Sequence, residues 1–389
     1  MSRRSGVAMV SRIFAPEVSA ASFRLSALAA ALAEAVDVTV LTVIPPEGAD
    51  LTDPGGTPRL RVLRWPVRRD RTGYVRGYLE YMSFDLPLLV RLALTPRPEV
   101  VVVEPPPTTG AVVRLVCALR RIPYVYNAAD VWSDATESTG APRLVVGVVR
   151  ALERSVLRGA RAVLSVSDGV TARVRELGAR EVVTVGNGVD TTVFTPEGES
   201  RGEGRFLLYA GTASEWQGAD IFVRAMPQVL EQHPDARLVF LGQGSSWPRL
   251  QDLARDLAPR SVDFHLLAPP AESAAWLRGA RAAVVSLRPG QKYDFAFPTK
   301  VLAALGTGTP VVYAGPGEAG ELLESEGMGW RCRYDVDAVA EAMIAALDHQ
   351  PPDNEGSRLA RWVEANRSLR AVARRSADVV LSAGGAAAG

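Results

Sequence analysis

The sequence predicts an α/β protein made of two doubly wound parallel-sheet domains that face each other across a cleft. Three observations predict this class. Strand-like runs alternate with helical runs along most of the 389 residues. A segment rich in Gly, Pro, Ser and charged residues interrupts the alternation near its middle, and the alternation then starts again. Strands that are separated by helices pair in parallel, because each helix carries the chain back to the same edge of the sheet.

The first half of the chain contains several strand-like runs. The run 99–104 (EVVVVE) is continuously β-branched, as expected for a strand buried on both faces. Helical patterns over 21–35 and 143–160 separate strands. The strand-like runs are 7–14, 37–44, 99–104, 123–130, 161–167 and 181–188.

The segment 195–205 (TPEGESRGEGR) has no periodic apolar face and is typical of an interdomain linker. It separates a first domain over 1–194 from a second over 206–356. A helix over 357–381 is expected to pack back on the first domain, and the tail 382–389 has too few bulky side chains to fold. The strand-like runs of the second domain are 206–211, 237–244, 262–268, 282–289, 310–315 and 330–333.

The composition indicates the cellular compartment of the protein and excludes some classes of partner. No stretch reaches the ~18 to 20 apolar residues that span a membrane, and the N-terminal apolar run is too short for a signal peptide. Cys117 and Cys332 lie in apolar patterns and indicate buried thiols in a reducing compartment. A formal net charge of +1 gives no general attraction to nucleic acid, and three histidines without a Cys/His cluster argue against zinc. We expect a cytoplasmic protein.

Glycine-bearing loops follow the first two strands of the second domain. Gly211 and Gly218 flank the first loop, and Gly242 and Gly244 open the second. Glycine lets main-chain N–H groups approach a phosphate closely, and a helix N-terminus adds a favourable dipole. Ordinary packing of a turn after a strand explains each loop equally well, so both interpretations stay open.

The segment 297–318 carries a third such loop. Pro298 can fix the start of a helix, Thr299 offers a hydroxyl, and Lys300 adds a positive charge. A cation that shares a helix N-terminus suits a diphosphate. We expect the diphosphate of a ligand here.

Polar residues follow buried strands of the first domain. Glu104 and Asp130 each come after such a strand, which directs them toward the cleft, and Asn127 precedes Asp130 on the same strand. Such carboxylates can bind an acceptor hydroxyl or accept its proton, and Asn127 can donate neutral hydrogen bonds. The alternative is that Glu104 and Asp130 only stabilise their loops.

The chain resembles the retaining nucleotide-sugar glycosyltransferases of the GT-B fold, family four. The segments that carry the resemblance come in the family's order along nearly the whole chain, and NGVDTTVF is the most specific of them. They are 11–42, 126–134 (YNAADVWSD), 151–178, 185–198 (VGNGVDTTVFTPEG), 209–220 (YAGTASEWQGAD) and 297–312 (FPTKVLAALGTGTPVV).

The resemblance implies a sugar transferase that acts on a hydroxyl acceptor and retains anomeric configuration without a protein nucleophile or a metal cofactor. Lys300 would neutralise the leaving diphosphate, and Asp130 and Glu104 would act on the acceptor. Acceptor contacts are expected from Asn127 and from Ser19 in the loop after the first strand. The remaining expected donor-binding residues are Gly211, Thr212, Gln217, Gly218, Gly242, Gly244, Arg288, Lys292, Asp294, Pro298 and Thr299.

Several positions depart from the family pattern. Ala303 and Phe295 stand where the family usually has glutamates, and Thr212 and Gln217 stand where it has arginine and lysine. Arg288 or Lys292 would then assist Lys300, and Asp294 would replace a missing carboxylate. The losses leave a catalytically degenerate partner subunit as an alternative.

Two other rivals share parts of the pattern. A sugar-nucleotide 2-epimerase has the same two-domain fold, but the shortage of histidines counts against it. A dinucleotide oxidoreductase is disfavoured, because no Gly-x-Gly-x-x-Gly follows the first strand.

The segment Arg59–Arg76 has seven arginines against one aspartate. Such a segment can meet anionic lipid head groups, or it can be a solvated strand and loop. We therefore expect either a lipid-linked acceptor, with the protein at the inner face of the cell membrane, or a soluble acceptor such as a natural product.

Overall fold

The computed structural model describes residues 6–17, 19–46, 58–70, 75, 77–138, 141–202, 205–290, 294 and 296–385. The chain forms two compact units. Unit 1 comprises Met1–Gly186 and Leu369–Gly389, and unit 2 comprises Asn187–Ser368.

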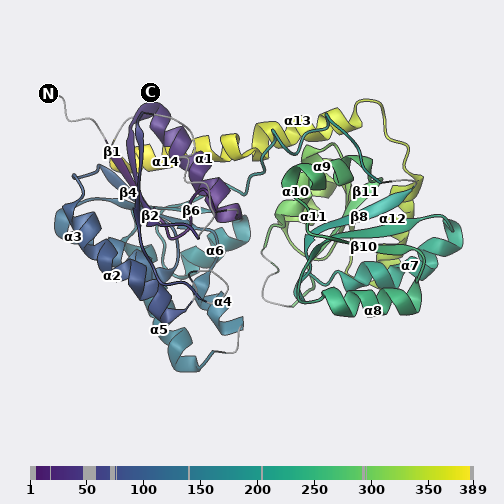
Figure 1. Cartoon of the computed structure of the whole chain (residues 1–389), viewed down its shortest axis with the longest axis horizontal. Coiled ribbons are helices and arrows are strands. Elements are labelled where there is room, and N and C mark those ends of the chain that lie inside the picture. Colours follow the sequence, from purple (N-terminus) through teal and green to yellow (C-terminus); the bar gives the residue numbers. More distant parts are fainter. Residues whose placement is uncertain are drawn as a thin grey trace. The chain divides into compact units, whose positions relative to one another are not determined.

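Unit 1 contains a seven-stranded, all-parallel sheet in the order β3-β2-β1-β4-β5-β6-β7 (Figure 1). The winding direction reverses between β1 and β4, where Val7 pairs with Val100. In such sheets ligands bind outside the carboxyl ends of the strands at the reversal point. The strands are β1 Gly6–Val10, β2 Asp37–Val43, β3 Leu60–Trp65, β4 Val100–Val103, β5 Tyr124–Ala128, β6 Ala162–Ser165 and β7 Val182–Thr184.

Helices cover both faces of this sheet. α1 and α14 pack together on one face, over a core of strand valines and α1 leucines, while α2, α3 and α5 lie side by side on the other face. The helices of unit 1 are α1 Ala20–Ala35, α2 Tyr78–Leu94, α3 Pro107–Arg120, α4 Trp132–Ser138, α5 Arg143–Gly159, α6 Asp168–Glu176 and α14 Leu369–Gly384.

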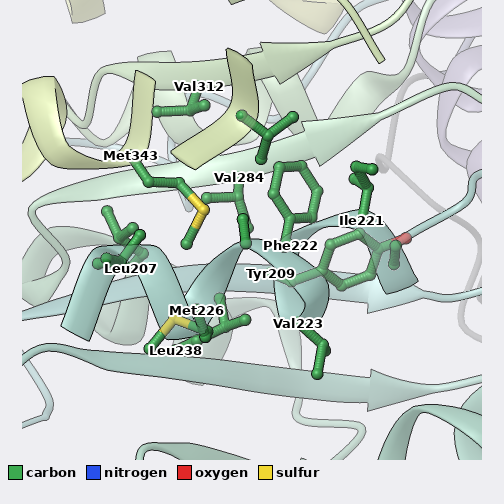
Figure 2. Close-up of a cluster of buried hydrophobic side chains, with 14 of the residues drawn as sticks. Leu207, Tyr209, Ile221, Phe222, Val223, Met226, Leu238, Val284, Val312 and Met343 are labelled. Carbon is green, nitrogen blue, oxygen red and sulfur yellow. The ribbon is translucent and has the colours of Figure 1, made fainter. Parts of the chain in front are cut away.

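Unit 2 contains a six-stranded parallel sheet in the order β10-β9-β8-β11-β12-β13, with its reversal point between β8 and β11. Its core is apolar on both faces of the sheet, and Figure 2 shows the cluster on the face covered by α7 and α12, which includes Tyr209, Phe222 and Met343. The strands are β8 Phe206–Thr212, β9 Arg237–Gln243, β10 Val262–Leu266, β11 Ala282–Ser286, β12 Val311–Ala314 and β13 Gly329–Cys332.

The helices of unit 2 connect these strands in the alternating pattern of a doubly wound domain. They are α7 Asp220–Gln232, α8 Trp247–Leu257, α9 Pro270–Gly279, α10 Thr299–Gly306, α11 Glu318–Ser325, α12 Val336–Asp348 and α13 Glu355–Arg367.

Two details differ from the sequence interpretation. The helix expected over 357–381 is two helices, α13 and α14, that meet at Ser368. Residues 187–194 group with unit 2, because the N–H of Val189 donates to the Arg367 carbonyl over 2.9 Å and Val189 forms a parallel bridge with Ser368. α13 belongs to unit 2 and α14 to unit 1, so only the second part of the expected helix lies on the first domain.

Candidate functional site

The carboxyl ends of β8 and β9 approach each other so closely that only glycine fits. A Cβ on Gly242 would lie 2.1 Å from the carbonyl oxygen of Gly211, and a Cβ on Gly244 would lie 2.1 Å from that of Ala213. Packing between the two strand ends therefore explains why residues 242 and 244 are glycines. Gly211 is different, because a Cβ there would face the Lys300 side chain, 3.5 Å from its Cε.

Lys300 is the second residue of α10, whose first residue Thr299 is exposed and whose N-cap Pro298 makes no side-chain cap. The Lys300 ammonium donates hydrogen bonds to the Tyr209 hydroxyl and to the Thr212 carbonyl, both over 2.8 Å. The Tyr209 hydroxyl in turn donates to the Thr212 carbonyl over 2.9 Å. These contacts hold a cation at the carboxyl end of β8, beside a helix N-terminus.

The electrostatics at Lys300 favour an incoming anion. Burial lowers the pKa of Lys300 to about 7, and its two hydrogen-bond partners are neutral oxygens. Only two of the 44 basic residues of the chain are lysines, Lys292 and Lys300. Lysine loses its proton readily when desolvated, whereas arginine keeps its charge. A negative ligand would restore the charge of Lys300.

The guanidinium of Arg288, which follows β11, is already paired. It donates to the Asp220 carboxylate at the first residue of α7. The Tyr334 hydroxyl donates to the Gly218 carbonyl over 2.7 Å, and a Cβ on Gly218 would lie 2.3 Å from that hydroxyl oxygen. The Nε–H of Arg288 is buried and donates no hydrogen bond within the described residues.

Three further residues expected at the donor serve the loops. Gln217 is buried, and its side-chain oxygen accepts from the N–H of Ser214 over 2.9 Å. The Asp294 carboxylate accepts from the N–H of Gly290 over 3.1 and 3.2 Å. Thr212 contributes its main-chain carbonyl to Lys300. Lys292 and Phe295 lie outside the described residues.

Unit 1 brings three polar residues together at its own reversal point. Glu104 directly follows β4 and is buried; one carboxylate oxygen accepts from Arg24 Nη2 over 2.6 Å and the other from Asn127 Nδ2 over 2.7 Å. Burial raises the pKa of Glu104, while Arg24 and Asn127 act in the opposite direction. Both carboxylate oxygens are thus engaged within the protein.

Asp130 differs from Glu104. It follows β5, is exposed, and accepts no hydrogen bond from the described part of the chain. Desolvation by the surrounding protein raises the pKa of the Asp130 carboxyl, and the positive charge of Arg24 opposes this shift. The buried Glu153 holds the next turn in place, because its carboxylate accepts the N–H groups of Trp132 and Ser133 over 2.8 and 2.9 Å.

Sequence reasoning missed two partners at these sites and assigned one residue differently. Arg24 on α1 and Tyr209 on β8 hold Glu104 and Lys300, yet neither stood out from its helical or strand pattern. Ser19, expected on the acceptor side, is the N-cap of α1, where its hydroxyl oxygen accepts from the N–H of Ser22 over 3.1 Å. The composition holds one signal that points to Lys300, because lysine is rare in this chain.

Two α/β units, each with a doubly wound parallel sheet, define a protein of the GT-B fold. Residues 20–188 match the family model of the glycosyl transferase 4-like domain, and residues 204–349 match that of the glycosyl transferases group 1. The chain is therefore a GT-B glycosyltransferase of the group 1 type.

Curated relatives match over part of their length. A stretch of 225 residues is 30% identical to the D-inositol 3-phosphate glycosyltransferase of Acidothermus cellulolyticus and covers 52% of this chain and 47% of that protein. The enzyme of the same name from Corynebacterium aurimucosum is 29% identical over 154 residues, 35% of each chain. The matched stretches thus span half or less of these relatives.

Solved structures share the whole fold at low identity. Sucrose-phosphate synthase from Thermosynechococcus elongatus has a TM-score of 0.73 at 17% identity, covering 97% of this chain and 98% of that one. Anabaena HepE, in complex with UDP and glucose, has a TM-score of 0.69 at 15% identity, with 97% and 99% covered. A putative UDP-N-acetylglucosamine 2-epimerase from Listeria monocytogenes reaches 0.61 at 13% identity, with 98% and 96% covered. At these identities the likeness concerns the fold alone.

Proposed function

We propose that the chain moves a sugar from a nucleoside-diphosphate sugar to a hydroxyl acceptor, with retention of anomeric configuration as in family four. Unit 2 would bind the donor and unit 1 the acceptor. The observation that carries the proposal is Lys300, held by Tyr209 and Thr212 beside the N-terminus of α10. A diphosphate is the donor part that a helix N-terminus and a lysine both attract.

Lys300 would act by neutralising charge. The bond between the sugar and the diphosphate breaks with negative charge growing on the leaving phosphate oxygen, and a fixed cation beside it stabilises that charge. The same role makes a divalent metal unnecessary in our proposal. Transfer should then persist in the presence of a chelator, with a chelator-sensitive rate as the contrary result.

The two carboxylates of unit 1 would have separate roles. Asp130, exposed and without a hydrogen-bond partner among the described residues, would accept a hydrogen bond from the acceptor hydroxyl. Glu104, whose oxygens are both engaged, would position Arg24 and Asn127. We thus move Glu104 from a catalytic to a positioning role.

A binding panel tests the donor assignment. Uridine, guanosine and thymidine diphosphates, with their nucleosides as controls, are titrated against the wild type and Lys300→Met by calorimetry. One diphosphate should bind well and lose affinity in the variant, while its nucleoside binds both proteins equally. Equal losses for nucleotide and nucleoside would reject the assignment.

The names of two matched relatives suggest which acceptor to test first. Two matched relatives are called D-inositol 3-phosphate glycosyltransferases, so inositol phosphate is the first soluble acceptor to test, against a lipid-linked polyol. Turnover by the purified chain also separates an enzyme from a degenerate partner subunit, and a product epimeric at the sugar would instead identify a 2-epimerase.

A further inference from the structure

Three neighbouring helices of unit 1 expose apolar side chains on the side away from the sheet. Helices α2, α3 and α5 lie side by side (Figure 1). Ten of the seventeen large apolar side chains that are exposed within the described residues belong to them. We call these ten the outer apolar face: Leu79, Leu86, Leu89, Val90, Leu94, Leu115, Leu119, Leu144, Val145 and Val148.

Helix α2 shows the feature most clearly, because it is apolar on opposite sides. Phe84, Leu88 and Leu92 are fully buried toward the sheet, while Leu86 and Leu94 are 66% and 79% exposed. A helix that is apolar all round is normally covered on all sides. The ten residues are too concentrated for the scattered exposed leucines of an ordinary surface.

The helices of the outer apolar face carry an excess of positive charge. Of the three acidic residues on the helices, Asp85 and Glu153 are buried and hydrogen-bonded within the protein, which leaves only Glu80 toward the surface. The same helices carry seven arginines. Arg91 and Arg120 donate to main-chain carbonyls and Arg150 pairs with Glu137. The exposed ones are Arg143, Arg154 and Arg158. Long arginine side chains at the edge of an apolar surface can extend their charged ends to head groups.

We propose that the outer apolar face docks unit 1 on an anionic lipid bilayer, with α2, α3 and α5 lying in the head-group layer. Apolar side chains would enter the boundary of the acyl chains, and the arginines would meet lipid phosphates. None of the described helices is long and apolar enough to cross a bilayer. The inference goes beyond the proposed transfer reaction, because docking does not depend on turnover.

Charge favours a bilayer over a second copy of the chain. A symmetric dimer through this face would bring the same patch from both copies together. Each copy would contribute its arginines, such as Arg143 and Arg154, with Glu80 as the one surface carboxylate on these helices to offset them. Anionic head groups supply the missing negative charge.

This surface differs from the segment that the sequence singled out. Within Arg59–Arg76, three described arginines donate to the protein's own carbonyls: Arg59 to Glu34, Arg64 to Ala15 and Arg69 to Ile44, over 2.9, 3.0 and 2.7 Å. Residues 71–74 and 76 lie outside the described residues. None of the ten residues of the outer apolar face lies in this segment, so we place the membrane contact on the helices.

Co-sedimentation with vesicles tests the proposal on the full chain. Vesicles of phosphatidylcholine mixed with phosphatidylglycerol are compared with pure phosphatidylcholine. The apolar variant is Leu86→Gln/Val90→Gln/Leu119→Gln, matched by Leu266→Gln/Leu267→Gln, which changes exposed leucines of unit 2. The charge variant is Arg143→Gln/Arg154→Gln, matched by Arg249→Gln/Arg255→Gln on α8. Thermal melting confirms that each variant is folded.

The wild type and both matched controls should bind anionic vesicles and release them as salt rises. The apolar variant should lose binding, and the charge variant should weaken it by roughly fivefold for each arginine. Equal binding to neutral and anionic vesicles would overturn the proposal. The proposal would also be overturned if the wild type does not bind vesicles and instead forms a dimer, detected by light scattering, that is lost in the apolar variant.

Discussion

The ammonium of Lys300 donates to the hydroxyl of Tyr209 over 2.8 Å and lies 4.0 Å from the centre of the same ring. The ring is buried in the core of unit 2 (Figure 2), so the lysine is attached to a rigid part of the protein. A positive charge fixed in this way can face a diphosphate without first being ordered by it.

Replacing Lys300 with Met should lower the affinity for the cognate nucleoside diphosphate by roughly 10- to 100-fold, because a hydrogen bond to a charged group contributes about 1.5 to 3 kcal/mol. Calorimetry measures the change. Arg249→Gln, which removes an exposed charge from α8 of the same unit, is the matched control and should bind as the wild type does.

Tyr209→Phe should reduce the same affinity by less. The ring stays in the core, and Lys300 keeps its contact with Thr212. The variant removes the hydrogen bond from Lys300 to the hydroxyl and the one from the hydroxyl to the Thr212 carbonyl. Only the first involves Lys300, so we expect a loss of about 1 kcal/mol, or roughly fivefold. Nucleoside affinity should not change. A Tyr209→Phe loss as large as that of Lys300→Met would mean that the hydroxyl itself contacts the ligand.

Nucleotide binding should depend on pH above neutrality. With the pKa of Lys300 near 7, the free protein is mostly unprotonated there at pH 8.5, and a bound diphosphate raises that pKa by favouring the charged form. Binding should therefore take up protons, and affinity should fall as pH rises from 7.5 to 9.5, above the range where phosphate itself titrates (about pH 6). Calorimetry in buffers of different ionisation enthalpy measures the uptake, and Lys300→Met should abolish it.

The same pKa predicts the pH dependence of stability without ligand. The unfolded chain holds the Lys300 proton up to its ordinary pKa of 10.5, whereas the folded protein releases it near 7. Between these values the unfolded state binds more protons, so this group makes the free energy of unfolding rise with pH. Relative to Lys300→Met, the wild type should gain stability from pH 7 to pH 10 in denaturant titrations; a constant difference would contradict the assignment.

Asp130→Asn should leave donor affinity unchanged and slow transfer by roughly 100- to 10,000-fold if the carboxylate accepts the acceptor's proton. Asp134→Asn is the matched control, because that neighbouring carboxylate pairs with Arg173 over 2.7 Å and has no proposed role in transfer. Loss of donor binding in a folded Asp130→Asn protein would assign the residue to the donor instead.

Arg24→Met should destabilise unit 1 by about 3 kcal/mol at neutral pH, because it leaves the buried Glu104 carboxylate without its cation. The loss should shrink as the pH falls, because burial raises the pKa of Glu104 and the protonated, neutral carboxyl needs no cation. Urea unfolding across an acidic pH range measures this. Arg24→Met/Glu104→Gln should recover much of the stability, and an equal loss in both variants would show that the ion pair is not the cause.

Local pattern was enough to predict the architecture. The run that forms β4 is four valines, as expected for a buried parallel strand. The strand-like runs of the chain alternate with helical segments, as a parallel sheet requires. The pattern failed where tertiary contacts decide: α2 is apolar on both sides and contains Pro87, so its periodicity is weak. Ser368 has no helix-breaking side chain, yet α13 ends before it, at the residue that forms a bridge with Val189.

The site could be predicted only where function and local structure coincide. Lys300 was predicted as a donor-site residue because a Pro-Thr-Lys turn at a helix start has a recognisable chemistry. The pairing of Arg24 with Glu104 joins residues 80 positions apart, and no local spacing reports it. Gln217 and Ser19 make main-chain contacts that the sequence did not predict, because a polar residue in a loop looks the same whether it caps the main chain or binds a ligand.

The most direct test of the central claim is NMR of the protein labelled with carbon-13 at lysine Cε. Only two lysines contribute signals, and Lys300→Arg identifies which signal is Lys300. We expect its pKa to be about 7 in the free protein and to rise toward the ordinary lysine value with saturating nucleoside diphosphate, while the nucleoside leaves it unchanged. A Lys300 signal whose position and titration stay the same with bound diphosphate would contradict a diphosphate site at the start of α10.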